Sequence, residues 1–81
     1  MNTSEPKAGE RITAVRVTDD SLTVDLLDGR TVTVPLAWYP RLFNADAQQR
    51  EHYEITVDGF GIHWPDLDED LSVKGFLAGA R

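Results

Sequence analysis

The stretch ITAVRVTDDSLTVDLLDGRTVTVPL, residues 12–36, decides the fold, because it alternates apolar and polar residues and is rich in Val and Thr. Alternation of this kind is typical of antiparallel strands with one face on a core. If Asp19 and Asp20 form a two-residue loop, Val17 lies opposite Leu22 and the apolar residues share one face. The stretch therefore predicts three antiparallel strands.

The second turn of this stretch needs a longer loop. A two-residue loop at Asp28-Gly29 would place Val24 opposite Thr33 and mix the two faces. A three-residue loop, Leu27-Asp28-Gly29, with its glycine in the left-handed conformation, places Val24 opposite Val32 instead. We predict this bulged turn, which leaves a polar outer face with Arg16 diagonal to Asp25. That face carries Arg16, Thr23, Asp25, Thr31 and Thr33.

The next segment, LAWYPRLFNADAQQREHY at residues 36–53, loses the alternation and is compatible with helical turns. Pro40 prevents one long helix, because it has no amide hydrogen and clashes with the preceding turn. We therefore predict two short helices. The second begins at Asp46, with Gln49 three residues on as in a capping box, and continues to about His52.

A second hairpin is predicted in YEITVDGFGIHW, residues 53–64, with a two-residue loop at Asp58 and Gly59. This register sets His63 across from Glu54 on one face. On the other face it pairs the apolar residues Ile55 with Ile62, Val57 with Phe60 and Tyr53 with Trp64.

After Pro65, which cannot continue a strand ladder, DLDED is predicted to be a loop that leads to a short helix. Ser72 is the expected N-cap and Gly79 the expected end. The residues expected to face the sheet are Val73, Phe76 and Leu77. The predicted fold is α+β, with a small antiparallel sheet, the order β-β-β-α-α-β-β-α and the helices packed on one face. We expect residues 1–10 to be a flexible tail and residues 11–81 a single domain.

Composition narrows the function. The 81 residues allow one domain, and the absence of cysteine excludes a disulfide framework and a thiolate metal site. A reducing cytoplasm fits best, and neither a signal peptide nor a membrane span is expected. The net charge of −6, with no basic cluster, disfavours direct binding to DNA or RNA.

The stretch IHWPDLDEDLSV, residues 62–73, gathers a histidine, a tryptophan and four acids. Its aspartates have the D-x-D-x-D spacing that opens a calcium loop, but Leu71 stands where Gly is needed and Leu77 where a bidentate Glu is needed. An EF-hand is therefore excluded. A weak divalent-metal site stays open, beside the interpretation that acids favour a helix N-terminus. The metal candidates are His63, Asp66, Asp68 and Asp70.

His63 opposite Glu54 has two interpretations, an acid/base dyad or a cross-strand ion pair. The sequence shows no third polar partner, no Gly-rich phosphate loop and no nucleophile motif. We therefore expect no enzymatic activity and no cofactor.

Aromatic residues gather in the connection between Pro35 and Pro40. Such residues belong most often to the core, but aromatic side chains and Arg are also enriched at interface hot spots. Trp38, Tyr39 and Arg41 are therefore a candidate contact patch.

The segments LDGRTVTVPLAWYPRLFNA and GFGIHWPDLDEDLSVKGFLAG resemble the bacterial domain of unknown function 2442 family over about residues 11–79. The second segment matches the family's tail pattern at Gly61, Ile62, Trp64, Pro65, Leu67, Asp68, Glu69, Asp70, Leu71 and Ser72. The resemblance implies a compact α+β domain with an antiparallel sheet. Some relatives are fused to a helix-turn-helix regulator, and others look like the smaller member of a toxin–antitoxin pair. No catalytic residue carries over.

Two functional hypotheses follow. In the first, the chain is a non-enzymatic protein-interaction module, antitoxin-like or regulatory, that presents its aromatic patch and acidic loop to a basic protein partner. In the alternative, His63 and the acids bind a divalent metal or a small ligand. Self-association and mimicry of nucleic acid by the acids also stay open. The residues expected to contact a partner are Trp38, Tyr39, Arg41, Asp66, Asp68, Glu69 and Asp70.

Overall fold

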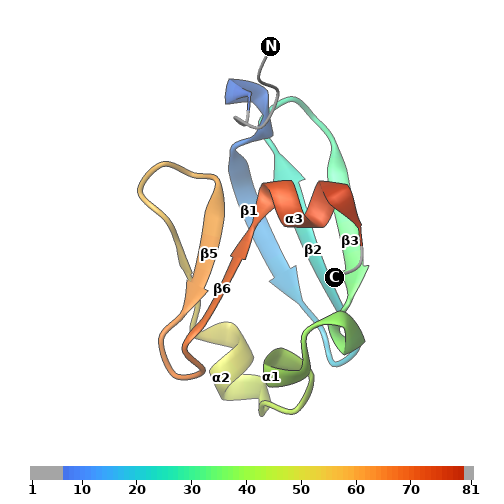
Figure 1. Ribbon diagram of the computed structural model, residues 1–81, viewed down its shortest axis with the longest axis vertical. Coiled ribbons are helices and arrows are strands. Elements are labelled where there is room, and N and C mark those ends of the chain that lie inside the picture. Colours follow the sequence, from blue (N-terminus) through green and yellow to red (C-terminus); the bar gives the residue numbers. More distant parts are fainter. Residues whose placement is uncertain (1–6, 80–81) are drawn as a thin grey trace.

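Eleven short elements make up the chain in the computed structural model, which describes residues 7–79. With η for a 3₁₀ helix, they are η1 (Ala8–Glu10), β1 (Ile12–Val17), β2 (Ser21–Leu26), β3 (Thr31–Pro35), η2 (Leu36–Trp38), α1 (Pro40–Phe43), α2 (Ala47–Glu51), β4 (Glu54–Ile55), β5 (Gly61–Trp64), β6 (Glu69–Ser72) and α3 (Val73–Ala78). The strands form two antiparallel sheets, β1-β2-β3 and β4-β5-β6 (Figure 1). The predicted α+β class is confirmed, but two three-stranded sheets replace the expected single sheet.

The register of the first sheet is confirmed at both turns. Val17 lies opposite Leu22 across the first turn, and Val24 lies opposite Val32 across the second. Gly29 has a φ of 97°, the left-handed conformation that the bulged turn requires. The three strands therefore point one apolar face inward, as the alternation predicts.

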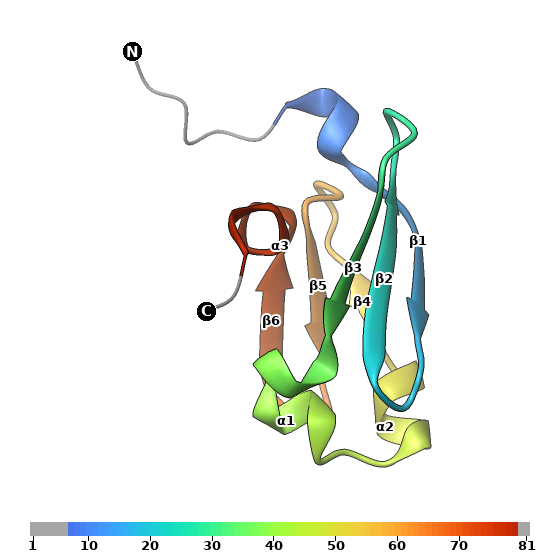
Figure 2. The same cartoon turned by 90° about the vertical axis from the view of Figure 1, so that its right-hand side faces the viewer.

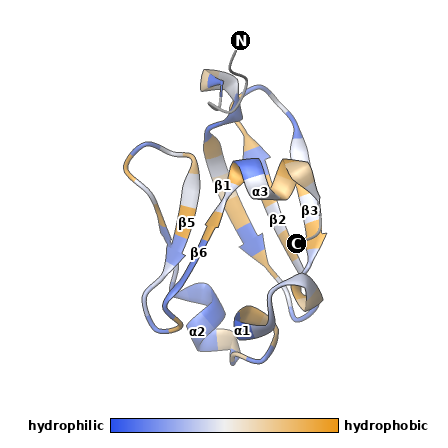
Figure 3. Cartoon of the chain, in the orientation of Figure 1, coloured by the Kyte–Doolittle hydropathy of each residue, from blue (hydrophilic) through white to orange (hydrophobic). Residues whose placement is uncertain are grey.

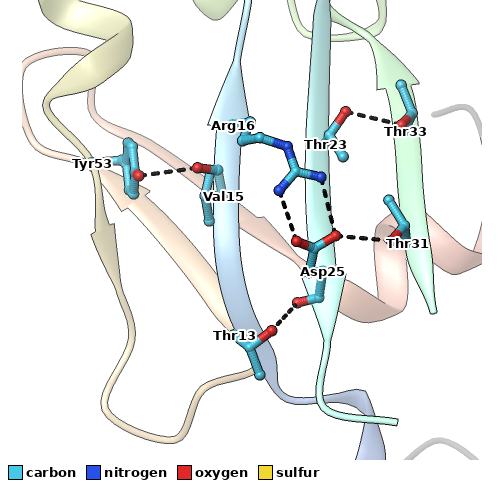
Figure 4. Close-up of polar contacts among 8 residues, drawn as sticks. All are labelled: Thr13, Val15, Arg16, Thr23, Asp25, Thr31, Thr33 and Tyr53. Atoms are coloured by element: carbon cyan, nitrogen blue, oxygen red, sulfur yellow. Dashed lines mark hydrogen bonds and ion pairs between the residues drawn. The ribbon is translucent and has the colours of Figure 1, made fainter. Parts of the chain in front are cut away.

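The outer face of this sheet is a closed polar network (Figure 4). Arg16 donates two hydrogen bonds to the Asp25 carboxylate, at 2.7 and 3.1 Å. The hydroxyl of Thr31 donates to the same carboxylate at 2.8 Å. The hydrogen bond from Arg16, followed by that from Thr31, lowers the pKa of Asp25. The predicted diagonal ion pair is therefore present.

The second sheet contains a strand that the sequence does not predict. Glu69–Ser72 pair with β5, so that Asp70 lies opposite His63 and Glu69 lies opposite Trp64. Only Pro65–Asp68 form the loop. Acidic residues are uncommon in strands, and pairing with β5 overrides that local preference.

The β4–β5 turn is wider than predicted. The amide of Thr56 donates to the carbonyl of Gly61 at 2.9 Å, which makes Val57–Phe60 a four-residue loop. The Asp58 carboxylate shapes this loop by accepting from the Phe60 amide at 3.0 Å. Val57 is consequently fully exposed and does not face the core.

The helices do not pack on one face. Figure 2 shows α1 and α2 at one end of the molecule, whereas α3 lies beside the top of β6. Ser72 caps α3 and Gly79 ends it, as predicted. Val73 and Phe76 are buried, but Leu77 is 38% exposed, so the predicted apolar face is only partly covered.

Part of the segment expected to be a flexible tail is structured. Ala8–Glu10 form η1, and the Gly9 carbonyl accepts from the Asp28 amide at 2.9 Å. Glu10 also pairs with Arg30 at 3.2 Å. The same expectation for residues 1–6 concerns residues outside the described range.

The α2 capping box is confirmed, with the Gln49 amide donating to Asp46 at 2.7 Å.

The core lies between the two sheets and is closed by helices. Its largest fully buried side chain is Trp64, whose indole N–H donates to the carbonyl of Arg50 in α2 at 3.0 Å. Two contacts join β1 to the second sheet: the Tyr53 hydroxyl donates to the Val15 carbonyl at 3.2 Å, and the Ile12 amide donates to the Gly59 carbonyl at 2.8 Å. The other buried apolar residues are Ile12, Leu22, Val24, Leu26, Val34, Leu36, Leu42, Ile62, Val73 and Phe76.

Burial predicts the effect of the same substitution at two leucines of one hairpin. Leu22 is 1% exposed and Leu27 is 60% exposed. Leu22→Ala should lower the free energy of unfolding by about 2–5 kcal/mol, because it leaves a cavity. Leu27→Ala should change it by less than about 0.5 kcal/mol. Urea denaturation of both variants measures the difference, and equal losses would contradict the core assignment.

Candidate functional site

The acidic turn, which we define as Asp66–Asp70, comprises most of the loop between β5 and β6 and the first two residues of β6. The Leu67 amide donates to the Trp64 carbonyl at 3.1 Å and closes the turn. Asp68 has a φ of 51°, the left-handed conformation that Asp adopts more readily than most residues. This backbone leaves Asp66, Asp68 and Asp70 exposed, whereas the Glu69 side chain is only 19% exposed.

Two histidines pair with the acidic turn from neighbouring elements. His52 Nδ1 lies 2.8 Å from Oδ2 of Asp66, and His63 Nδ1 lies 2.6 Å from Oδ1 of Asp70. Glu54 lies opposite His63, as the predicted register requires. The hydrogen-bond partner of His63 is nevertheless Asp70, from the strand that the sequence does not predict.

The pKa of His52 is raised above its ordinary value. The hydrogen bond to Asp66 is the main cause, and the charges of Asp66 and, to a smaller degree, Glu54 act in the same direction. Desolvation lowers the pKa and opposes them. Protonation of this ring is therefore coupled to the conformation of the acidic turn.

Arg41 joins the predicted aromatic patch to the acidic turn. Its guanidinium donates to the Asp68 carbonyl at 2.7 Å and lies 3.6 Å from the Glu69 carboxylate. The contact crosses from α1 to the end of the second sheet, so two segments predicted separately form one surface. We name Trp38, Tyr39, Arg41 and the acidic turn together the turn surface.

The aromatic part of the turn surface is anchored in the core. Trp38 and Tyr39 make an edge-to-face contact with ring centroids 6.4 Å apart. Tyr39 makes another with the buried Phe76 at 6.2 Å. Burial, followed by the charge of Glu69, raises the pKa of the Tyr39 hydroxyl. Both rings are half-buried, which fixes their position while leaving part of each accessible.

The four metal candidates do not converge on one point, although His63 and Asp70 lie 2.6 Å apart. Asp66 turns toward His52, and Asp70 toward His63. Within residues 7–79, no three His, Asp or Glu side chains are placed to hold one metal ion.

A shallow cavity of about 140 Å³ lies apart from the turn surface, between the β1–β2 turn and α2. Arg50 contributes to its wall, but the guanidinium donates to the Leu42 and Phe43 carbonyls at 3.0 and 2.8 Å. Two of the hydrogen-bond donors of the Arg50 guanidinium are thus used by the protein itself. The wall is formed by Val17, Thr18, Asp19, Ala47, Arg50 and Glu51.

The segment that contains the acidic turn is rich in acids. Residues 51–72 carry seven acidic side chains and no Lys or Arg. Figure 3 shows hydrophilic residues over α2 and the start of β6, next to the turn. This part of the molecule therefore presents a negative potential.

Comparisons with known proteins concern family and fold. The family model described as Protein of unknown function (DUF2442) matches residues 12–81. A solved structure, described as a protein of unknown function from Rhodospirillum rubrum ATCC 11170, is 35% identical, with a TM-score of 0.75, over 86% of this chain and 87% of that one. No curated protein matches. None of the helices within residues 7–79 is long and apolar enough to cross a membrane.

The His52–Asp66 pair predicts a pH dependence. By NMR, the pKa of His52 should lie above about 6.5 in the wild type and return toward that value in Asp66→Asn. Because the pKa is raised in the folded state, the pair stabilises the fold fully below about pH 6.5 and loses this effect as the pH rises through the raised pKa. The stability gap between wild type and His52→Gln should therefore be larger at acidic than at alkaline pH. An unchanged titration in Asp66→Asn would contradict the pairing.

Proposed function

The chain belongs to the family described as Protein of unknown function (DUF2442), a description that names no activity, and we propose from its geometry that it is a non-enzymatic module that binds another protein. The observation that supports this most is that the acidic turn is held in place by contacts from three other parts of the chain. Arg41, His52 and His63 supply those contacts.

A fixed acidic surface suits a basic partner. The side chains of Asp66 and Asp70 remain 42% and 74% exposed while paired with their histidines. Since the turn is already ordered, binding does not have to pay the cost of ordering it. Attraction between the turn and Lys or Arg of the partner would speed association and help to select the partner.

Trp38 and Tyr39 supply the apolar part of the proposed contact. Their half-buried rings lie next to Arg41, and aromatic residues and Arg are the types most often found at interface hot spots. A partner segment that combines basic and apolar side chains would therefore match the turn surface. The acids would set the orientation, and the rings would contribute most of the buried apolar area.

The finer role that we propose is that of an antitoxin-like or regulatory partner of another small bacterial protein. Its support is the resemblance of some relatives to the smaller member of toxin–antitoxin pairs. A cytoplasmic location is part of the same proposal and agrees with the absence of cysteine.

The experiment that tests this function compares two variants with the same change in charge. The turn variant carries Asp66→Asn, Asp68→Asn and Asp70→Asn, because Asn also tolerates the left-handed conformation at position 68. The control variant carries Asp19→Asn, Asp20→Asn and Glu51→Gln, three acids outside the turn surface. Each immobilised protein is exposed to a nuclease-treated lysate of the native host, and bound proteins are identified by mass spectrometry.

The wild type and the control variant should retain one basic protein that elutes as the salt concentration rises, because surface electrostatics are screened by salt. The turn variant should lose it while its thermal melt shows a folded protein. Two results would refute the proposal. In the first, the turn variant retains the same protein as well as the wild type does. In the second, the control variant loses the basic protein and the turn variant keeps it.

A further inference from the structure

The outer edge of β3 has backbone groups without a partner. In the part of the chain that the structure describes, β3 pairs with β2 alone. The Leu26 amide bonds to the Arg30 carbonyl, so the alternation of an antiparallel ladder points the backbone of Val32 and Val34 toward β2. The N–H and C=O groups of Thr31 and Thr33 therefore point away from the sheet, and both residues are exposed.

The other sheet edges are protected. The register of β1 shifts between Ile12 and Ala14, and its outer edge is covered by the bonds from Ile12 to Gly59 and from Tyr53 to Val15. The two-residue β4 is too short to template another strand. β6 carries two acids, and charged side chains discourage edge pairing. β3 is longer and carries no charge.

We propose that the outer edge of β3 pairs antiparallel with β3 of a second copy of this chain and forms a symmetric dimer. A twofold axis at Val32 places Thr31 of each copy opposite Thr33 of the other. Each of these threonines then both donates and accepts a backbone hydrogen bond, so the outward groups of Thr31 and Thr33 are all satisfied. A register centred on Thr33 would instead place Thr31 opposite Pro35, which has no amide hydrogen.

The side chains fit the same register. On the outer face, the Thr33 hydroxyl lies 2.9 Å from that of Thr23, so Thr31 of the second copy would extend this row of hydroxyls. On the inner face, the half-buried Val32 would meet Val32 of the second copy. Such a pair of β-branched residues on neighbouring strands is favourable.

Charge favours a second copy as the occupant. The acids of residues 51–72 lie in the second sheet, in its loops and in α2, and Figure 1 draws β5 and β3 on opposite sides of the molecule. Arg30, the residue before β3, is already paired with Glu10 and Asp28. Two neutral edges therefore meet without bringing the acidic regions together. This inference is independent of the function proposed for the turn surface.

The test is sedimentation equilibrium of the full chain from micromolar to millimolar concentration. The wild type should approach twice its mass of 9.1 kDa as the concentration rises. Thr33→Pro removes an N–H that points away from the sheet in the monomer, so the fold is retained while association weakens by about tenfold or more. Thr33→Ala loses the hydroxyl but keeps the N–H, and should associate much more strongly than Thr33→Pro.

Amide exchange provides a second readout that needs no variant. The amide protons of Thr31 and Thr33 should exchange more slowly as the wild-type concentration rises, whereas that of Val17 on β1 should not change. A monomer throughout the concentration range would overturn the proposal. So would a dimer that Thr33→Pro does not weaken, or one formed without protection of Thr31 and Thr33.

Discussion

The rest of the structure depends on the burial of Trp64. Its ring is fully buried, and its indole N–H is satisfied by the carbonyl of Arg50. A buried indole without that acceptor would destabilise the core, so the end of α2 has to lie against β5. The same position brings His52, one residue beyond α2, to Asp66. One hydrogen bond of a buried ring thus places both the second sheet and a contact of the acidic turn.

Around this anchor, the polar groups are divided between surfaces with different partners. On the first sheet, Arg16 and Asp25 bind each other and leave little charge to interact with anything else. At the acidic turn, the partners Arg41, His52 and His63 are fewer than the acids, and the side chains of Asp66 and Asp70 stay partly in water. The local imbalance, rather than the net charge of the chain, distinguishes this surface from the rest of the molecule.

The sequence predicts those features that arise from neighbouring residues. The first two turns, the capping box at Asp46 and the caps of α3 follow from the alternation of apolar residues and from local side-chain chemistry. The strand at Glu69–Ser72 could not be predicted, because acids disfavour strands and only pairing with β5 stabilises this one. The residues of the turn surface were identified from their types, but the contact of Arg41 with Asp68 depends on the tertiary packing of α1.

The bond between Tyr53 and Val15 joins residues 38 positions apart, whereas the turns of the first sheet join near neighbours. Closing a loop of that length costs about 3 kcal/mol of chain entropy, plus a constant, before any contact compensates for it. Low contact order therefore favours early formation of the first sheet, and the second sheet closes over β1 later. Until it does, the β1 edge has neither the tyrosine nor the Gly59 carbonyl to cover it. The chain is then most exposed to aggregation through a strand that the native fold protects.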